Sequence, residues 1–329
     1  MSAPARPRRV AALVIAVIAG GCDGESIARP YDEPLVVNGG QFFEGSLPGA
    51  PPLTADEIVA GVAPAPPLVT SYEFAGRNVR PGELGKSLRG RTSGDALSVA
   101  FAFAEQGSGY WIRPLGGPDV AFPGELAWAA DVDFGHQLRP GLHELLFAAI
   151  DASGHAGTQV SARLCVTSPV PDNSNACDPT VAPPNTVLSL EWDSDVDLDL
   201  ELVTPEGKRV SAKSPTSALT EEGEVDPDGA AARLDRDAGL GCSGAGDRRE
   251  NIVFEALPPP GRYTVYANLF AACAEPSVRF SLTLYGVGPG DEPGTFRQVE
   301  TYRIAGVQLA PQASAGQKPP QYVTQFVVE

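Results

Sequence analysis

Acidic side chains alternate with apolar ones along one short stretch, and their type and spacing suit metal binding. Within residues 188–202 every even position except Ser194 is apolar, and carboxylates occupy the odd positions from 191 onward. This alternation predicts a β-strand whose carboxylates share one face, about 6.7 Å from one to the next. Two such side chains are close enough to contact one cation. The candidate ligands on this strand are Asp193, Asp195, Asp197 and Asp199.

A second group of carboxylates, Asp235, Asp237 and Glu250, follows later in the sequence. Residues 191–255 carry 17 acidic and 7 basic residues, which gives this region a net charge of −10. Calcium takes six to eight oxygen ligands, so we expect the seven carboxylates of both groups to provide ligands for a calcium ion. The alternative is a water-facing acidic surface without metal, because exposed carboxylates repel one another only weakly in salt solution.

The N-terminal segment predicts export and covalent lipid attachment. Three arginines precede an apolar core at residues 10–18, and small residues then lead to Cys22. This order is typical of a signal peptide, here residues 1–21, and the core is too short to cross a bilayer of about 30 Å. We expect Cys22 to become the first mature residue and to carry diacylglycerol and acyl chains. These chains would hold the protein in the membrane of a bacterial cell envelope, on its periplasmic or cell-surface side.

The other four cysteines form an even set, which in an exported chain predicts two disulfides. Four cysteines allow three pairings, and we favour the sequence-local one, Cys165–Cys177 and Cys242–Cys273. The first bond would close a loop of about 13 residues and stabilise the fold by about 3 kcal/mol. Neither pair has the close ligand spacing of a zinc site or a histidine beside it.

Short strands must position all of these groups. The 329 residues include 36 Gly and 32 Pro, a density that interrupts long helices and separates strands by turns. We therefore expect an all-β chain with two β-sandwich domains. The first is an immunoglobulin-like sandwich at 68–167, and a linker at 168–185 follows it. The second is a jelly-roll-like sandwich at 186–329 with an acidic loop at 208–246. Residues 22–67, rich in Pro, Gly and acids, are expected to be a flexible tether.

Alternating or apolar runs predict the individual strands. In the first sandwich, a strand before the turn at 151–154 and another after it resemble the last hairpin of an immunoglobulin-like domain. The expected strands are 96–103, 110–112, 145–150 and 160–166 in the first sandwich, and 252–257, 261–270, 278–285, 296–307 and 322–328 in the second.

Several short motifs of the second sandwich occur in a familiar order. They are WDSDVDLDL at 192–200, TPEG at 204–207, DRD at 235–237, ENI at 250–252 and GRYTV at 261–265. In this order they resemble a bacterial extracellular β-sandwich module of unknown function, found alone or appended to secreted hydrolases and von Willebrand-type proteins. That module is similar to the jelly-roll domains that follow secreted peptidases. The resemblance covers about residues 187–285, and Cys242 and the arginines before Glu250 depart from it. The whole chain also resembles predicted lipoproteins of GC-rich bacteria with large genomes.

Charge and missing motifs exclude several functions. The net charge of −17 becomes −20 without the three arginines of the signal peptide, which excludes nucleic acid as a partner. The sequence has no G-x-S-x-G motif, no complete H-E-x-x-H motif and no phosphate-binding loop. We therefore expect a non-enzymatic, lipid-anchored protein that binds or scaffolds an envelope protein or a glycan. The alternatives are an accessory component of a secreted hydrolase acting on glycans or peptides, and a structural part of a secretion or motility assembly.

Overall fold

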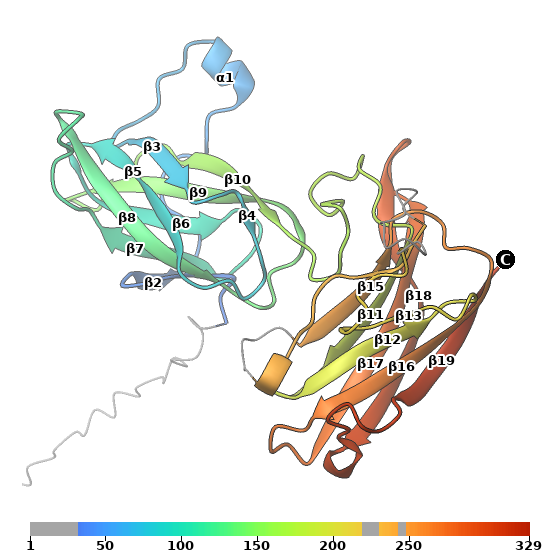
Figure 1. Cartoon of the computed structure of the whole chain (residues 1–329). Coiled ribbons are helices and arrows are strands. Elements are labelled where there is room, and N and C mark those ends of the chain that lie inside the picture. Colours follow the sequence, from blue (N-terminus) through green and yellow to red (C-terminus); the bar gives the residue numbers. More distant parts are fainter. Residues whose placement is uncertain (1–31, 219–229, 243–247) are drawn as a thin grey trace, which may run out of the picture.

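The chain folds almost entirely into β-strands, which confirms the all-β prediction. The structure is a computed structural model, and it describes residues 32–218, 230–242 and 248–329. The strands form four sheets, two in each half of the chain (Figure 1). The expected signal peptide and Cys22 lie outside the described residues. Among the described residues, no helix has the length and apolar character needed to cross a membrane.

The first sandwich consists of a four-stranded and a six-stranded sheet, with strand orders β1-β8-β5-β3 and β2-β7-β6-β9-β10-β4. Neighbouring strands are antiparallel, except that β4 pairs with β10 in parallel. The strands are β1 (Leu35–Val37), β2 (Gln41–Glu44), β3 (Val69–Phe74), β4 (Asn78–Val79), β5 (Lys86–Ser93), β6 (Ala96–Phe103), β7 (Gly109–Pro114), β8 (Glu125–Phe134), β9 (Gly141–Asp151) and β10 (Val160–Val166).

An aromatic cluster fills the core between these two sheets. Phe101, Trp128 and Phe147 are buried, and their ring centroids lie 5.5 to 5.8 Å apart. Alternation on β8 puts Trp128 and Val132 into this core, while Ala129 and Asp131 face outward. Each such buried ring or branched side chain contributes roughly 1.5–3 kcal/mol to folding.

Residues 35–44 belong to this sandwich, so the prediction of a flexible tether up to residue 67 is wrong for them. Strand β1 pairs with β8, and β2 pairs with β7. The side chain of Leu35 is only 3% exposed, and its carbonyl accepts a 2.6 Å hydrogen bond from Trp111 Nε1. Runs of three or four residues give too short an alternation to stand out among Pro and Gly. Burial against strands about 100 residues away decides their structure instead.

The segment between β2 and β3 projects from the sandwich (Figure 1). It contains the short helix α1 (Ala55–Val59), in which no residue is buried. Thr54 and Glu57 form a capping box at its start: Glu57 N donates to Thr54 Oγ1, and Thr54 N donates to Glu57 Oε2. Since a helix of five residues is marginal in water, this cap is what favours it locally.

The second sandwich consists of a five-stranded and a four-stranded antiparallel sheet, with strand orders β14-β15-β11-β17-β18 and β13-β12-β16-β19. The strands are β11 (Thr186–Trp192), β12 (Asp197–Val203), β13 (Arg209–Val210), β14 (Arg233–Leu234), β15 (Arg249–Phe254), β16 (Gly261–Ala271), β17 (Ser277–Pro289), β18 (Phe296–Leu309) and β19 (Gln321–Val328). Two single-turn 3₁₀ helices, η2 (Leu240–Cys242) and η3 (Ala310–Gln312), lie in the connections.

The strand predicted over 188–202 is in fact two strands in different sheets. Strand β11 ends at Trp192, β12 begins at Asp197, and residues 193–196 cross from one sheet to the other. The apolar side chains of both strands face one core, which contains Leu188, Leu190, Leu198 and Leu200. The alternation of apolar and acidic residues therefore continues through residues 193–196, although these residues do not form a strand. Ser194, the one polar residue at an even position, lies in this crossing.

The acidic loop expected at 208–246 is partly regular within its described residues. It contains β13, β14 and η2, and it contributes Val210, Ala232 and Leu234 to the core. Leu234 N donates to Pro215 O at 2.8 Å, which fixes one part of the segment to another. The expectation of a long loop is therefore wrong for these parts, because buried apolar residues lie among the acids.

Both disulfides form with the expected pairing. Cys165–Cys177 joins β10 to the segment that follows it, and Cys242–Cys273 joins η2 to the turn after β16. Residues 168–185 also pack on the second sandwich. Val170 lies in a small apolar cluster with Val187 and Val253, and Asn175 Nδ2 donates to Phe296 O at 2.9 Å. The linker is thus bound to both halves of the chain.

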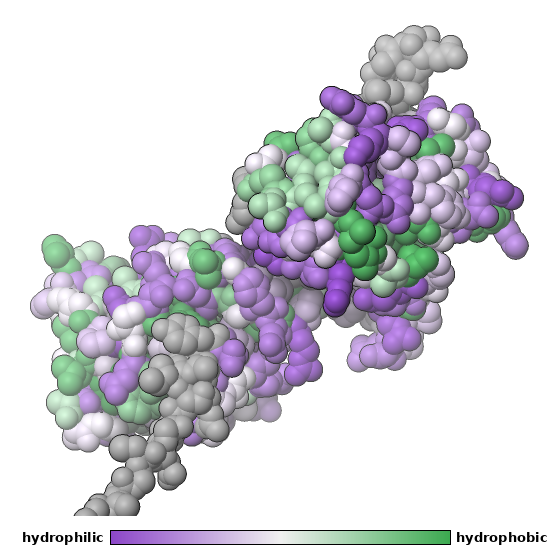
Figure 2. Space-filling view, turned by 90° about the horizontal axis from the view of Figure 1, so that it is seen from below, coloured by the Kyte–Doolittle hydropathy of each residue, from purple (hydrophilic) through white to green (hydrophobic). Residues whose placement is uncertain are grey.

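The surface is mixed in character. Figure 2 shows hydrophilic groups over much of the face seen from below, with hydrophobic groups between them on both halves of the chain. Strands β18 and β19 are edge strands and carry exposed apolar side chains, among them Val307, Tyr322 and Val327. On β18, charged residues such as Glu300 and Arg303 interrupt these apolar positions, which disfavours uncontrolled edge pairing.

Candidate metal centre

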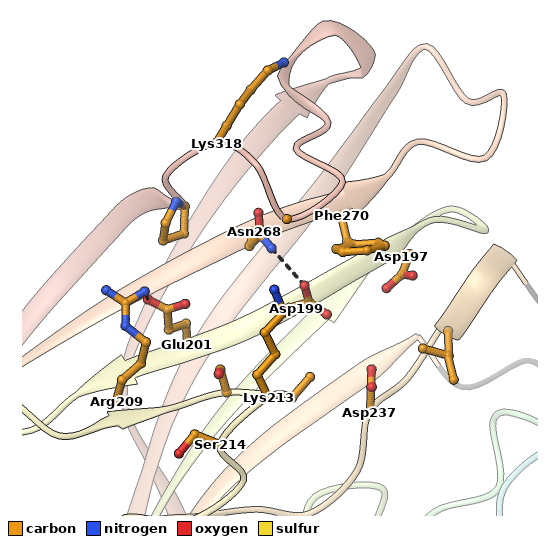
Figure 3. A pocket seen from close by; sticks show the side chains of 15 residues that line it. Asp197, Asp199, Glu201, Arg209, Lys213, Ser214, Asp237, Asn268, Phe270 and Lys318 are labelled. Atoms are coloured by element: carbon orange, nitrogen blue, oxygen red, sulfur yellow. Dashed lines mark hydrogen bonds and ion pairs between the residues drawn. The ribbon is translucent and has the colours of Figure 1, made fainter.

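Three of the seven predicted ligands meet in space. One carboxylate oxygen from each of Asp197, Asp199 and Asp237 lies within 4.8 Å of the other two. We call these three residues the aspartate triad. Asp197 and Asp199 stand on the outer face of β12, and Asp237 comes from the segment after β14 (Figure 3). The triad thus combines two stretches of chain that are about 40 residues apart.

The two strand aspartates are not part of a water-facing acidic surface, the alternative interpretation of the sequence. Asp197 is only 2% exposed, and Asp199 is partly buried. Within the described part of the chain, the Asp197 carboxylate accepts one hydrogen bond, from Gly241 N at 3.1 Å. Asp237 is exposed and has no hydrogen-bond or ion-pair partner among the described residues. Burying carboxylates with so few donors is costly unless another positive group compensates.

Glu250 does not belong to the triad, but it accepts hydrogen bonds from the backbone of both segments that carry the triad. It is fully buried on β15, where Oε2 accepts a 2.7 Å hydrogen bond from Leu200 N and Oε1 accepts one of 3.0 Å from Ala238 N. One carboxylate therefore joins the strand of Asp199 to the segment of Asp237. Burial raises the pKa of Glu250 to about 9, and the charges of Asp199 and Asp237 add to this rise.

The backbone of the Asp237 segment approaches β12 closely. A Cβ atom on Gly239 would lie 2.5 Å from the carbonyl oxygen of Val196, and Gly239 has a φ of 79°. Only glycine fits this position without strain. Two residues later Gly241 N donates to Asp197, and the Cys242–Cys273 disulfide then fixes the end of the segment. The backbone at residues 239–242 is thus fixed by close packing at Gly239 and by the disulfide at Cys242.

The triad repels itself electrostatically. Two unit charges 4.8 Å apart repel by about 0.9 kcal/mol in water and by about 3.5 kcal/mol at an effective dielectric constant of 20. Burial, together with the charge of Asp197, raises the pKa of Asp199 to about 7. Burial likewise raises the pKa of Asp197, and Asp237 adds to this effect. Without a cation, the site therefore tends to retain a proton near neutral pH.

One neutral donor and one cation oppose this repulsion, since the charge of Lys213 also acts to lower the pKa of Asp199. Asn268 stands opposite Asp199 on the neighbouring strand β16, and its Nδ2 donates to Asp199 Oδ2 at 2.9 Å (Figure 3). Ser314 Oγ donates to Asn268 Oδ1 at 2.8 Å, which orients the amide. Nothing in the sequence alone singled out Asn268. Its position two residues before Phe270 on the outer face of β16 becomes meaningful only when β12 and β16 are paired.

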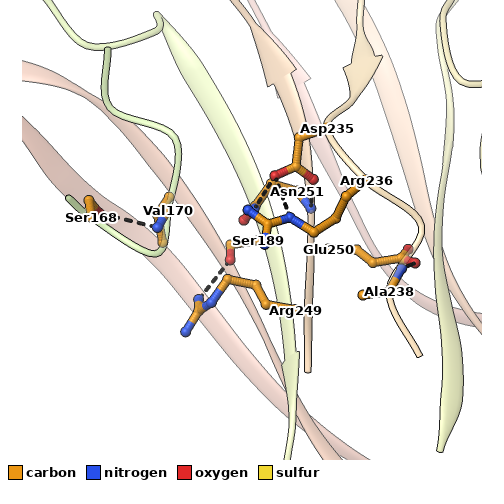
Figure 4. Close-up of polar contacts among 9 residues, drawn as sticks. All are labelled: Ser168, Val170, Ser189, Asp235, Arg236, Ala238, Arg249, Glu250 and Asn251. Carbon is orange, nitrogen blue, oxygen red and sulfur yellow. Dashed lines mark hydrogen bonds and ion pairs between the residues drawn. The ribbon is translucent and has the colours of Figure 1, made fainter. Parts of the chain in front are cut away.

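The other predicted ligands do not reach the triad. Asp193 Oδ1 accepts a hydrogen bond from Arg279 N at 3.0 Å, and Asp195 forms an ion pair with Arg248 Nη2 at 2.7 Å. Both lie in the crossing after β11, which turns them away from β12. Asp235 accepts hydrogen bonds from Asn251 N and Nδ2, both at 2.9 Å, on the other side of the β15 strand from Glu250 (Figure 4). As a prediction of metal ligands, these three residues are not supported by the geometry.

A pocket of about 410 Å³ adjoins the triad. Its floor is the outer face of the sheet β13-β12-β16-β19, and its walls are loop residues on both sides (Figure 3). Besides the triad, the residues of interest in its lining are Lys213, Leu240, Asn268, Phe270 and Pro320. A cation at the triad would therefore face a space large enough for a small ligand.

No protein-family model matches the chain, and no curated protein matches its sequence. Among solved structures it is similar to dimeric latent PorU from Porphyromonas gingivalis, with 11% identity, a TM-score of 0.23 and coverage of 79% of this chain. The chain spans only 21% of the length of PorU. It is also similar to the collagen adhesin (CNA) from S. aureus, with 10% identity, a TM-score of 0.15 and coverage of 73% of this chain and 95% of that one. Likenesses at these TM-scores carry no argument about function.

Proposed function

We propose that the second sandwich binds a calcium ion between Asp197, Asp199 and Asp237. The observation that carries this proposal is the convergence of three carboxylates, two of them partly or fully buried, on one point. Two oxygens that bind one calcium ion at about 2.4 Å are at most about 4.8 Å apart, which is the bound that the triad satisfies. The ion would replace three mutual repulsions by attraction to a double positive charge.

The ligand chemistry favours calcium over other metals. All three ligands are carboxylates, and the triad contains no histidine or cysteine, the ligands that select zinc. Magnesium binds oxygens at about 2.0–2.1 Å and requires near-octahedral geometry. Calcium has longer and more variable bonds, and it tolerates the irregular arrangement of one oxygen from each of three carboxylates better than magnesium does.

In the same proposal the chain is a non-enzymatic, lipid-anchored protein that binds or scaffolds a partner at a bacterial cell envelope. The signal-peptide pattern before Cys22 supports export and lipid attachment. Two disulfides support it as well, since such bonds persist in oxidising compartments. The ion would have a structural role, because it joins the Asp237 segment to β12 at the edge of the pocket.

Thermal unfolding tests the calcium site. The chain from residue 32 onward contains both cores and both disulfides, and it can be studied without the lipid. Calcium at 100 times its dissociation constant adds about 2.7 kcal/mol, which should raise the melting temperature of the second sandwich by about 5 °C or more. An Asp199→Asn variant should lose this rise, while Asp193→Asn should keep it. An unchanged melting temperature of the original protein in saturating calcium would refute the site.

A further inference from the structure

The pocket beside the triad combines three features that point to one class of ligand. These are an incomplete cation site, an ammonium group that forms no hydrogen bond or ion pair among the described residues, and an apolar ring. We propose that the pocket binds an acidic saccharide, a uronate unit, through the calcium ion and Lys213. This inference rests on the calcium site proposed above and adds the chemistry of its ligand.

The first feature is the open side of the cation site. The triad offers one oxygen from each of three residues, whereas calcium takes six to eight. The remaining coordination positions face the pocket, because the triad lies in its lining (Figure 3). Three carboxylates and one calcium ion already sum to a net charge of −1. Neutral hydroxyl oxygens therefore complete the coordination at a lower electrostatic cost than a fourth carboxylate would.

The second feature is the ammonium group of Lys213 at the rim of the pocket. Within the described part of the chain, Lys213 takes part in no hydrogen bond or ion pair, and its charge acts only at longer range to lower the pKa of Asp199. The other two basic residues of the lining are already engaged. Arg209 is ion-paired with Glu201, and Lys318 Nζ donates to two backbone carbonyls, Pro311 O at 2.8 Å and Ala313 O at 3.0 Å. A ligand that places an acidic group beside the cation would find its counter-charge at Lys213.

The third feature is an apolar wall close to this ammonium group. A Cβ atom on Gly316 would lie 3.2 Å from Lys213 Nζ and 3.3 Å from Phe270 Cε2, so both side chains reach the same backbone position. Phe270 stands on the outer face of β16, and Leu240 and Pro320 complete the apolar lining. The C–H face of a sugar ring can cover such a surface while its hydroxyls point to the cation.

These features together distinguish a uronate from other ligands of similar size. Adjacent ring hydroxyls supply two neutral oxygens to one ion, and the carboxylate on the same ring points to Lys213. A neutral sugar would bring no negative charge to this ammonium group. A peptide offers carbonyl oxygens to the ion, but it also brings backbone N–H groups that need acceptors of their own.

Calorimetric titration of the chain from residue 32 onward tests the inference. The probes are calcium alone, and then trimers of galacturonate, glucuronate and mannuronate in calcium or in a chelator. Methyl-esterified trimers keep every hydroxyl but lose the charge, and a hexapeptide of glutamate represents acidic peptides. We expect at least one uronate trimer to bind in calcium only, and its ester to bind at least tenfold more weakly.

Two lysine variants complete the design. Lys213 is exposed, so Lys213→Met should fold and lose at least tenfold in affinity for the uronate. It should bind calcium at least as tightly as the original protein, because the charge of Lys213 acts on Asp199 and competes with the ion there. Lys208→Met removes a nearby exposed lysine outside the pocket and should change neither value. Calcium binding without any uronate binding would overturn this inference and leave the calcium site standing. Equal binding of the ester or of the glutamate peptide, or an unchanged affinity in Lys213→Met, would also overturn it. Absence of calcium binding would refute both proposals.

Discussion

The triad should lower stability without calcium, through repulsion, and raise it with calcium, through binding. The substitution Asp237→Asn separates these two effects. Asp237 is exposed and has no hydrogen-bond or ion-pair partner among the described residues, so the change removes a charge and little else. Each of its two repulsions is worth about 0.9 kcal/mol in water and about 3.5 kcal/mol at an effective dielectric constant of 20, taking the 4.8 Å bound as the distance. Because Asp237 is exposed, the lower value applies. We expect the metal-free variant to be more stable by about 2 kcal/mol at pH 8, where Asp199 is ionised.

Urea unfolding of the chain from residue 32 onward, followed by tryptophan fluorescence, measures this change. Trp192 lies in the core of the second sandwich and reports on its unfolding. In a chelator the Asp237→Asn variant should unfold at a higher urea concentration than the original protein. In excess calcium the order should reverse, because the variant has lost a ligand and gains little from the ion.

The matched control is Asp195→Asn. Asp195 is an aspartate of the same acidic stretch, but it pairs with Arg248 at the surface and does not reach the triad. Exposed ion pairs are worth about 1 kcal/mol or less, so this variant should change little and keep its full response to calcium. Two results together would refute the electrostatic reasoning. The Asp237→Asn variant would be less stable than the original protein in chelator, and calcium would still stabilise it as strongly as the original protein.

Three further predictions concern pH, the second disulfide and the N-terminus. Without calcium, the second sandwich should lose stability as the pH rises from about 4 to 7. Asp199 and Glu250, with pKa values of about 7 and about 9 instead of 3.8 and 4.5, bind their protons more tightly when folded, and the shift of Asp199 alone corresponds to about 4 kcal/mol. Urea unfolding in chelator that is independent of pH over this range would contradict this. Replacing Cys242 and Cys273 by Ser should weaken calcium binding by about tenfold, since the segment that donates Gly241 N to Asp197 is released. Calorimetry checks this value, and equal affinity in the variant would show that the disulfide does not support the site. Replacing Cys22 by Ser should abolish labelling by a palmitate analogue, and labelling that persists would disprove lipid attachment at this residue.

The amino-acid sequence predicts the fold class well because alternation and turn residues are local signals. The expected strands at 261–270 and 296–307 correspond closely to β16 and β18. The disulfides were also predictable from the sequence, because four cysteines in an exported chain allow only three pairings. By contrast, β1 and β2 have only three or four residues each, and partners distant in the sequence determine their burial. No local pattern of that length carries enough information.

The candidate site was only partly predictable for a related reason. Period-two alternation correctly places Asp197 and Asp199 on one face, but it continues unbroken through the crossing at residues 193–196. Asp193 and Asp195 therefore look equivalent to them in the sequence although they turn away. Glu250 is a buried connecting group rather than a ligand, and this role depends on which backbone N–H groups the fold brings to it. Pairing across sheets, which a single sequence does not encode locally, decides each of these cases.

The most direct test of the central claim is a crystal structure of the chain from residue 32 onward grown in calcium, with anomalous scattering used to locate the ion. We predict one anomalous peak with carboxylate oxygens of Asp197, Asp199 and Asp237 all at about 2.3–2.6 Å. A well-ordered triad without such a peak in saturating calcium would contradict the account.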